Sequence, residues 1–323
     1  MWNRDRVLFL KDIRGDTQGS INKMLAAVDA ERSECFKQED RDRIFHVVKT
    51  EVGFAGVNSM VFKRMREWVI DVTRNAMEEA GGDAQEQLYL KRALAELYSQ
   101  QGAYQQAEQL HLEALQGFKE QLGADHLDTL LSMNNLANLY RVQSKYQEAE
   151  PLFLQCLEGY RIKLGTDHPD TLRSMNGVAN LYLNQGRYED AEPLYLECLE
   201  GRKVKLGADH PDTLRTMNNL ANLYQTQGRY EEAEPLYLQC LDGYREKLGA
   251  DHPETLRSMN NLATMYFNQE RYEEAEPLYL HSYKCRKVKL GADHPDTLLS
   301  RNDLADVYMA QGRDAEAELL GGE

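Results

Sequence analysis

The sequence has few cysteines, few prolines and no long apolar run. Five cysteines in 323 residues are too few for a disulfide-stabilised secreted domain, and they are typical of a reducing compartment. No apolar stretch approaches the ~20 residues that a membrane-spanning helix needs. Near the start of the chain, Val7, Leu8, Phe9 and Leu10 lie between charged residues and form too short a run for a signal peptide. We therefore expect a cytoplasmic protein with no membrane insertion.

Basic residues are also in short supply. There are 38 Lys and Arg against 53 Asp and Glu, which gives a formal net charge of -15. Affinity for nucleic acid and for anionic lipid depends on neutralising negative charge, so we expect neither as a partner. Hydrophobic residues make up 42% of the chain, which is enough for a packed core and argues against a disordered chain.

From Gly81 onward the sequence repeats every 42 residues without insertion or deletion. Residues 81–323 comprise five such repeats and a truncated sixth, whereas residues 1–80 do not repeat and form a separate N-terminal segment. A period in this range is typical of stacked-repeat proteins. Two series of prolines and one series of Asp-His pairs follow the period: Pro169, Pro211, Pro253 and Pro295; Pro151, Pro193, Pro235 and Pro277; and pairs at 125–126, 167–168, 209–210, 251–252 and 293–294.

Each repeat has the pattern of two helices, as residues 165–206 illustrate. Pro169 suits the first position of a helix, where its missing N–H is harmless. Apolar residues then follow at helical spacing up to Tyr182. Gly186 suits the turn that ends this helix, and a second helix is expected from about Tyr188. No strand-like alternation occurs in 81–323, so the sequence predicts an all-α fold.

The run MNNLANLYQTQGRYEEAEPLYLQCL at 217–241 resembles a tetratricopeptide repeat, in the 42-residue form of kinesin light chains. The resemblance implies a right-handed superhelical solenoid of helix-turn-helix repeats, with an N-terminal helical segment before it. It also implies that the first helices line a concave groove, which usually holds a peptide from a partner protein. The matching positions are Leu220, Ala221, Tyr224, Gly228, Tyr230, Ala233 and Cys240.

We expect no enzyme, because the chain has no Walker loop, no His-Glu-x-x-His and no nucleophile elbow. The recurring Asp-His pairs could form a metal ladder or acid–base pairs, or they could cap the helices that follow them. We favour caps, because a catalytic residue has no reason to recur in every repeat. Cys156, Cys198 and Cys240 occupy equivalent positions, and we expect buried small side chains there. No metal site and no cofactor is predicted.

A row of polar residues runs along the first helix of each repeat. In one repeat Arg173, Asn176, Asn180 and Asn184 lie at i, i+3, i+7 and i+11, on one face. Amides suit the backbone of an extended peptide, and the arginines suit its acidic groups. Alternatively, the amides hydrogen-bond to neighbouring helices and tie the repeats together. The predicted peptide-binding residues are Asn134, Asn138, Arg173, Asn176, Asn180, Asn184, Arg215, Asn218, Asn222, Arg257, Asn260 and Asn302.

The two ends of the chain leave further alternatives open. Helices are plausible at about 20–36, 40–50 and 57–80, as a cap on the array or as a separate module. In the last repeat we expect one side of Leu298, Leu304, Val307 and Tyr308 to be partly bare and to offer a contact surface. The favoured function is thus a peptide-binding scaffold or adaptor. The alternative is a structural repeat protein that forms homo-oligomers through its C-terminal end.

Overall fold

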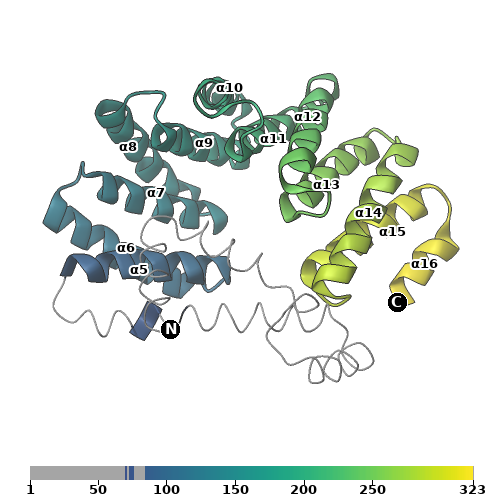
Figure 1. The fold of residues 1–323 in the computed structure, drawn as a ribbon, viewed down its shortest axis with the longest axis horizontal. Coiled ribbons are helices and arrows are strands. Elements are labelled where there is room, and N and C mark those ends of the chain that lie inside the picture. Colours follow the sequence, from purple (N-terminus) through teal and green to yellow (C-terminus); the bar gives the residue numbers. More distant parts are fainter. Residues whose placement is uncertain (1–69, 71–72, 76–83, 323) are drawn as a thin grey trace, which may run out of the picture. The chain divides into compact units, whose positions relative to one another are not determined.

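The computed structural model describes residues 70, 73–75 and 84–322. The helices predicted at 20–36 and 40–50 lie outside these residues, as does most of the one at 57–80. Within 84–322 every regular element is an α-helix (Figure 1), which confirms the all-α prediction. The helices are α5 (Ala84–Gln100), α6 (Tyr104–Leu122), α7 (Leu127–Val142), α8 (Tyr146–Leu164), α9 (Pro169–Asn184), α10 (Tyr188–Leu206), α11 (Pro211–Thr226), α12 (Tyr230–Leu248), α13 (Pro253–Asn268), α14 (Tyr272–Leu290), α15 (Pro295–Ala310) and α16 (Asp314–Gly322).

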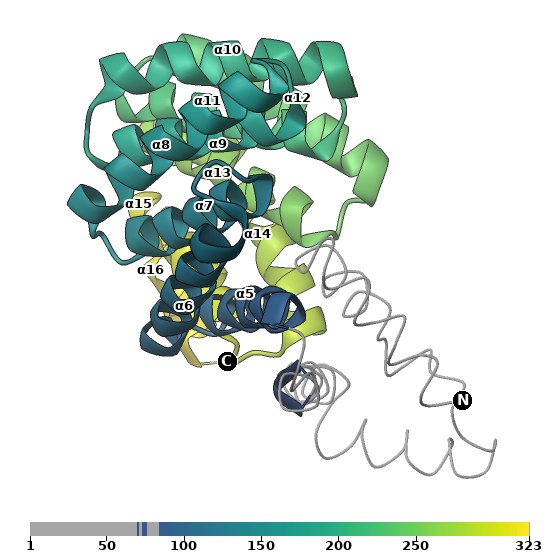
Figure 2. The same ribbon diagram turned by 90° about the vertical axis from the view of Figure 1, so that its left-hand side faces the viewer.

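The helices pair in chain order within each of two compact units, and the division between the units falls inside α10, between Leu194 and Tyr195. In the first unit α5 packs against α6 and α7 against α8 (Figure 2). In the second unit α11 packs against α12, α13 against α14 and α15 against α16. The first helices of successive repeats also touch, as α5 with α7, α7 with α9, and α11 with α13. The fold is therefore an array of paired antiparallel helices, while the handedness of a superhelix stays a prediction.

A histidine caps the first helix of each repeat from the second onward. In α9 the Nδ1 of His168 accepts a hydrogen bond from the backbone N–H of Asp170 at 3.2 Å, and Pro169 is the first helical residue. We expected both members of each Asp-His pair to act as caps, but in the described repeats it is the histidine that does so. The same bond recurs at His126, His210, His252 and His294.

The turn between the two helices of a repeat requires a left-handed backbone conformation. Gly186 supplies it with φ 74°, which a residue without a Cβ adopts at little cost. Two repeats place a larger residue there, namely Ser144 with φ 60° and Glu270 with φ 61°. The left-handed conformation of the turn is thus kept where the glycine is replaced.

The core lies between the two helices of each repeat and continues into the neighbouring repeat, as in the cluster that joins α6, α7 and α8. Cys156 and Cys240 are fully buried in it, and their thiols donate to the carbonyl oxygens of Leu130 and Leu214, each at 3.2 Å. Burial raises the pKa of Cys156 to about 11 and that of Cys240 to about 12. With Cys198, which is also buried and free, they confirm the prediction of small buried side chains.

Neighbouring repeats are joined by an arginine at the start of the second helix. The guanidinium of Arg271 lies 4.2 Å from the ring centroid of Tyr266 and donates to Glu234 of the preceding repeat at 2.8 Å. Glu234 therefore connects two successive repeats. The same arrangement recurs at Arg313 with Tyr308 and Glu276, and at Arg187 with Tyr182 and Glu150.

The last helix pair corrects one expectation. Leu304, Val307 and Tyr308 are buried, so the prediction that they are partly bare is wrong, because the short helix α16 already packs against α15. Leu298 alone stays half-buried, whereas Leu256, at the same position one repeat earlier, is buried.

Candidate functional site

The predicted arginines lie at the surface of the first helices. Nη2 of Arg173 is 2.6 Å from Oδ1 of Asp170, Nη2 of Arg215 is 2.6 Å from Oδ1 of Asp212, and Arg257 pairs in the same way with Glu254. Their side chains are 43%, 43% and 49% exposed. Each arginine is thus oriented by an acidic residue three positions earlier, and its remaining N–H donors can reach a ligand.

The first row of amides is different, because most of it lies inside the protein. Asn134, Asn176 and Asn218 are only 3%, 6% and 4% exposed. In the second unit the Oδ1 of Asn218 accepts a hydrogen bond from Nδ2 of Asn261, one repeat later, at 3.2 Å. This contact supports the alternative that the amides in this row tie repeats together.

A similar contact joins the next two repeats, where Nδ2 of Asn260 lies 3.5 Å from Oδ2 of Asp303. In the first unit the partner is missing: Oδ1 of Asn134 is buried without a hydrogen bond. The residue that would donate to it, one repeat later, is Gly177. A Cβ at Gly177 would lie 2.6 Å from Cε1 of Phe153, so a larger residue there would require Phe153 to shift.

Further along the helices the predicted residues are more open. Asn180 and Asn222 are half-buried and Asn184 is exposed, and Asn302, which stands at the position of Asn260 in the last repeat, is exposed as well. The hydroxyl of Tyr237 lies 2.5 Å from Oδ1 of Asn222 and 2.6 Å from Oε1 of Gln225, so these two amide oxygens share its one proton. Asn138 is also half-buried, and it donates to the backbone oxygen of Asn134 at 3.0 Å. Oδ1 of Asn184 accepts from Arg141 at 3.1 Å.

In the first repeat, two positions of the array carry residues that differ from those of the second repeat. Arg92 stands at the position of Asn134; it is 3.1 Å from Oδ1 of Asp128, and it lies over the rings of Tyr89 and Phe118. His111 stands at the position taken by Phe153 in the next repeat, and both of its ring nitrogens are buried without a hydrogen bond. Burial and, to a smaller extent, the charge of Arg92 lower the pKa of His111 to about 4.

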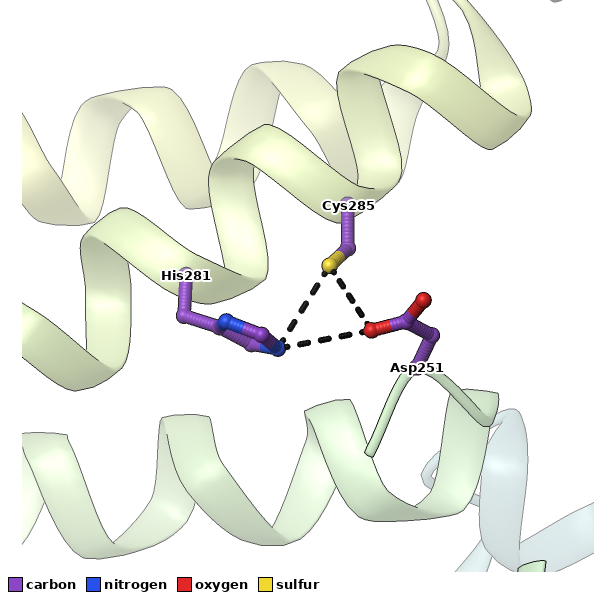
Figure 3. Close-up of side chains that lie close together, drawn as sticks. All are labelled: Asp251, His281 and Cys285. Carbon is purple, nitrogen blue, oxygen red and sulfur yellow. Dashed lines mark hydrogen bonds and ion pairs between the residues drawn. The ribbon is translucent and has the colours of Figure 1, made fainter. Parts of the chain in front are cut away.

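Sequence reasoning missed a cluster of metal-ligating side chains in the second unit. Asp251, from the turn before α13, meets His281 and Cys285 of α14 (Figure 3). Sγ of Cys285 is 3.2 Å from Oδ1 of Asp251 and 3.5 Å from Nε2 of His281, and Nε2 of His281 is 3.5 Å from Oδ1 of Asp251. The signal in the sequence was the departure of residues 281 and 285 from their counterparts in the other repeats.

The match to a family model covers most of the chain. The model described as "Tetratricopeptide repeat" matches residues 86–162, 133–203, 170–246, 212–287 and 254–323. No curated protein matches. Among the described residues, no helix combines the length and the apolar character needed to cross a bilayer.

Several solved structures are similar to this chain. A kinesin light chain-like protein of Podosopora anserina with nearly identical TPR-like repeats is 26% identical with a TM-score of 0.54, over 64% of this chain and 97% of that one. BtubC (BKLC) of P. vanneervenii is 20% identical with a TM-score of 0.55, over 66% and 85%. NprR in complex with its cognate peptide NprX is 18% identical with a TM-score of 0.59, over 94% and 87%. The last two similarities concern the fold alone.

Proposed function

The chain belongs to the tetratricopeptide repeat family, and we propose that it is a non-catalytic adaptor whose first helices bind an extended, acidic peptide of a partner protein. The observation that supports this most is the recurrence of Arg173, Arg215 and Arg257 at one exposed position, 42 residues apart. NprR, which is similar to this chain in fold, has been solved in complex with its cognate peptide NprX.

The arginines are suited to bind acidic groups, because little free energy is lost when an arginine exchanges its intrahelical Asp or Glu for a ligand carboxylate. An exposed ion pair within one helix contributes only about 0.3–0.5 kcal/mol. A ligand carboxylate can therefore take N–H donors from Arg215 without a large penalty, while Asp212 keeps the guanidinium near its binding orientation. Two N–H donors of one guanidinium can bind the two oxygens of a carboxylate, and this pair of hydrogen bonds fixes the geometry of the contact.

The half-buried amides complement the arginines. Oδ1 of Asn222 lies beside the hydroxyl of Tyr237, and the N–H donors of Asn222 suit the carbonyl oxygens of a peptide. Asn180 occupies the same position one repeat earlier. In this proposal Asn180, Asn184, Asn222 and Asn302 contact the peptide, whereas Asn134, Asn176, Asn218 and Asn260 act mainly within the array.

The test is an array of extended peptides that carry two or more Asp or Glu residues, each beside a copy with Asn or Gln in their place. The full chain should bind a subset of the acidic peptides and lose most of that binding to the neutral copies. Binding of the Arg215→Glu/Arg257→Glu variant to the same peptides should be reduced at least tenfold, because two attractive contacts become repulsive.

A matched control comes from the second helix α12. Arg245 is also exposed and lies 4.0 Å from Asp242, three residues earlier. Arg245→Glu changes the net charge in the same direction but should leave peptide binding nearly unchanged. Equal losses for the two kinds of variant would mean that only overall charge matters, and the proposal would be wrong.

Self-association is the second candidate function, and exposed apolar side chains at the last helix pair favour it. Leu299 and Met309 on α15 and Leu319 on α16 are all exposed. In this candidate function these side chains would form part of a contact surface between chains. Sedimentation over a hundred-fold concentration range distinguishes the candidates: Leu299→Lys/Leu319→Lys should abolish any concentration-dependent assembly and leave peptide binding intact.

A further inference from the structure

Two residues of α14 break the pattern of the repeats at the same place. His281 stands where the earlier repeats have Gln155, Glu197 and Gln239, and Cys285 stands where they have glycine. The two are four residues apart, so they lie on one face of α14. They belong to a stretch, 281–285, in which every residue differs from the preceding repeat (HSYKC for QCLDG), and they are the two that bring ligand atoms to Asp251.

Helix packing does not account for the cysteine. In two other repeats a Cβ at the equivalent glycine would lie 2.7 Å from Cδ2 of Leu130 (Gly159) or 2.8 Å from Cδ2 of Leu214 (Gly243). At both positions the added Cβ would meet the flexible end of a leucine side chain, so a larger residue fits once that leucine shifts, but nothing in the packing calls for a thiol. The thiol of Cys285 points toward Asp251 and His281 (Figure 3).

The third member, Asp251, recurs in every repeat from the second onward, so its presence needs no special reason. What is specific to this repeat is that Asp251 gains two ligand-bearing neighbours. Lys289 holds it in place, since its Nζ donates to the backbone oxygen of Asp251 at 2.9 Å and lies 3.8 Å from Oδ2. Outer contacts of this kind orient metal ligands and offset part of their charge.

The three ligand atoms have the spacing of one face of a zinc coordination tetrahedron. With zinc bonds of about 2.0–2.1 Å to nitrogen and oxygen and about 2.3 Å to sulfur, tetrahedral angles place ligand atoms about 3.3–3.6 Å apart. The observed separations are 3.2, 3.5 and 3.5 Å. We propose that Asp251, His281 and Cys285 bind a divalent zinc-class metal ion, with water at the fourth position.

The donor types fit this class of metal. Thiolate and imidazole select zinc and its neighbours over calcium and magnesium, which prefer sites made only of oxygen. On binding, the Sγ–metal bond replaces the S–H bond, and the thiol proton passes to solvent. The ion would link the turn at Asp251, which precedes the first helix of the repeat, to the second helix, α14.

Cobalt and zinc titrations of the full, metal-free chain under reducing conditions test the proposal. One equivalent of Co²⁺ should give a thiolate-to-cobalt charge-transfer band and the strong visible bands of a tetrahedral site. Zn²⁺ should abolish both at one equivalent. The variant His281→Gln/Cys285→Gly has the residues of the preceding repeat at these positions, so it should fold, and its zinc affinity should fall by more than the 10–100-fold typical of losing an outer contact.

Two more variants complete the test. Asp251→Asn removes an exposed ligand without touching the core and should also lower the affinity for zinc. Asp209→Asn changes the equivalent residue of the preceding repeat, where Gln239 and Gly243 stand in place of His281 and Cys285, and this variant should bind zinc like the wild type. The proposal is wrong if the wild type gives no charge-transfer band, or if zinc binds equally well to the His281→Gln/Cys285→Gly variant.

Discussion

Nδ2 of Asn261 donates a hydrogen bond over 3.2 Å to Oδ1 of Asn218, one repeat earlier. The acceptor is almost fully buried, so a peptide could reach it only by displacing Asn261. This pair therefore divides the polar face of the first helices into two parts. One part joins the repeats, and the more exposed part, with Arg215 and Asn222, is available to a ligand.

The first prediction concerns this inter-repeat hydrogen bond. Asn218→Ala removes the acceptor and leaves the amide of Asn261 short of a partner, so the free energy of unfolding should fall by about 1–3 kcal/mol. Urea denaturation measures the change. Asn302→Ala is the control, because Asn302 is exposed at the equivalent position of the last repeat and its loss should change stability by no more than about 0.5 kcal/mol. Equal effects of the two substitutions would contradict the tying role.

Helix propensity alone predicts the opposite result. Alanine is a better helix former than asparagine by several tenths of a kcal/mol, so the peptide-binding interpretation predicted no loss of stability, and only the alternative, in which the amides tie the repeats together, predicts one. The spacing of Asn218 predicted which face of α11 it occupies, but that spacing could not reveal how closely α13 covers it. The distinction between a groove residue and a tying residue depends on contacts 43 residues apart, which a helical pattern does not contain.

The second prediction concerns the arginine that joins repeats. Arg271 lies over Tyr266 and pairs with both Glu234 and Glu274, so Arg271→Ala should lower the free energy of unfolding by about 1–2 kcal/mol. Arg245→Ala, which removes an exposed pair within one helix, should cost less than about 0.5 kcal/mol. If the two variants unfold at the same urea concentration, Arg271 does not join the repeats.

The fold was more predictable than the site, because the residues that each structural feature requires recur in several repeats of the sequence. The caps at His168 and His210 and the buried Cys156 and Cys240 all follow from periodicity and helix physics. The metal-ligating cluster was missed for the same reason: a search for what recurs passes over His281 and Cys285, which occur once. Asp251 was interpreted as part of a cap, and only the structure places it beside the other two.

The third prediction is a pH dependence that originates at His111. Its pKa is about 4 in the folded protein because burial and Arg92 disfavour the charged form, against an ordinary value of 6.5. A group whose pKa is depressed on folding stabilises the protein above its unfolded pKa, and that contribution is lost as the pH falls toward the folded value. The free energy of unfolding should therefore fall between pH 6.5 and about 4.

The substitution that tests this is His111→Phe, because Phe153 fills the equivalent position in the next repeat. The variant should be more stable than the wild type at pH 5, and the difference between the two should shrink as the pH rises to 7. Urea denaturation at pH 5, 6 and 7 gives the comparison. His252, whose pKa is also lowered by burial, is present in both proteins and cancels. A difference that does not change with pH would exclude His111 as the source.

The central claim is that the peptide lies along the first helices, and site-specific photocrosslinking tests it most directly. A photoreactive residue is placed at Thr226, which is exposed at the end of α11, or at Leu238, which is exposed on α12. Each protein is then irradiated with an acidic peptide selected on the array. The account predicts crosslinked peptide with the label at residue 226 and little or none with the label at residue 238. Crosslinking at residue 238 but not at residue 226 would contradict it.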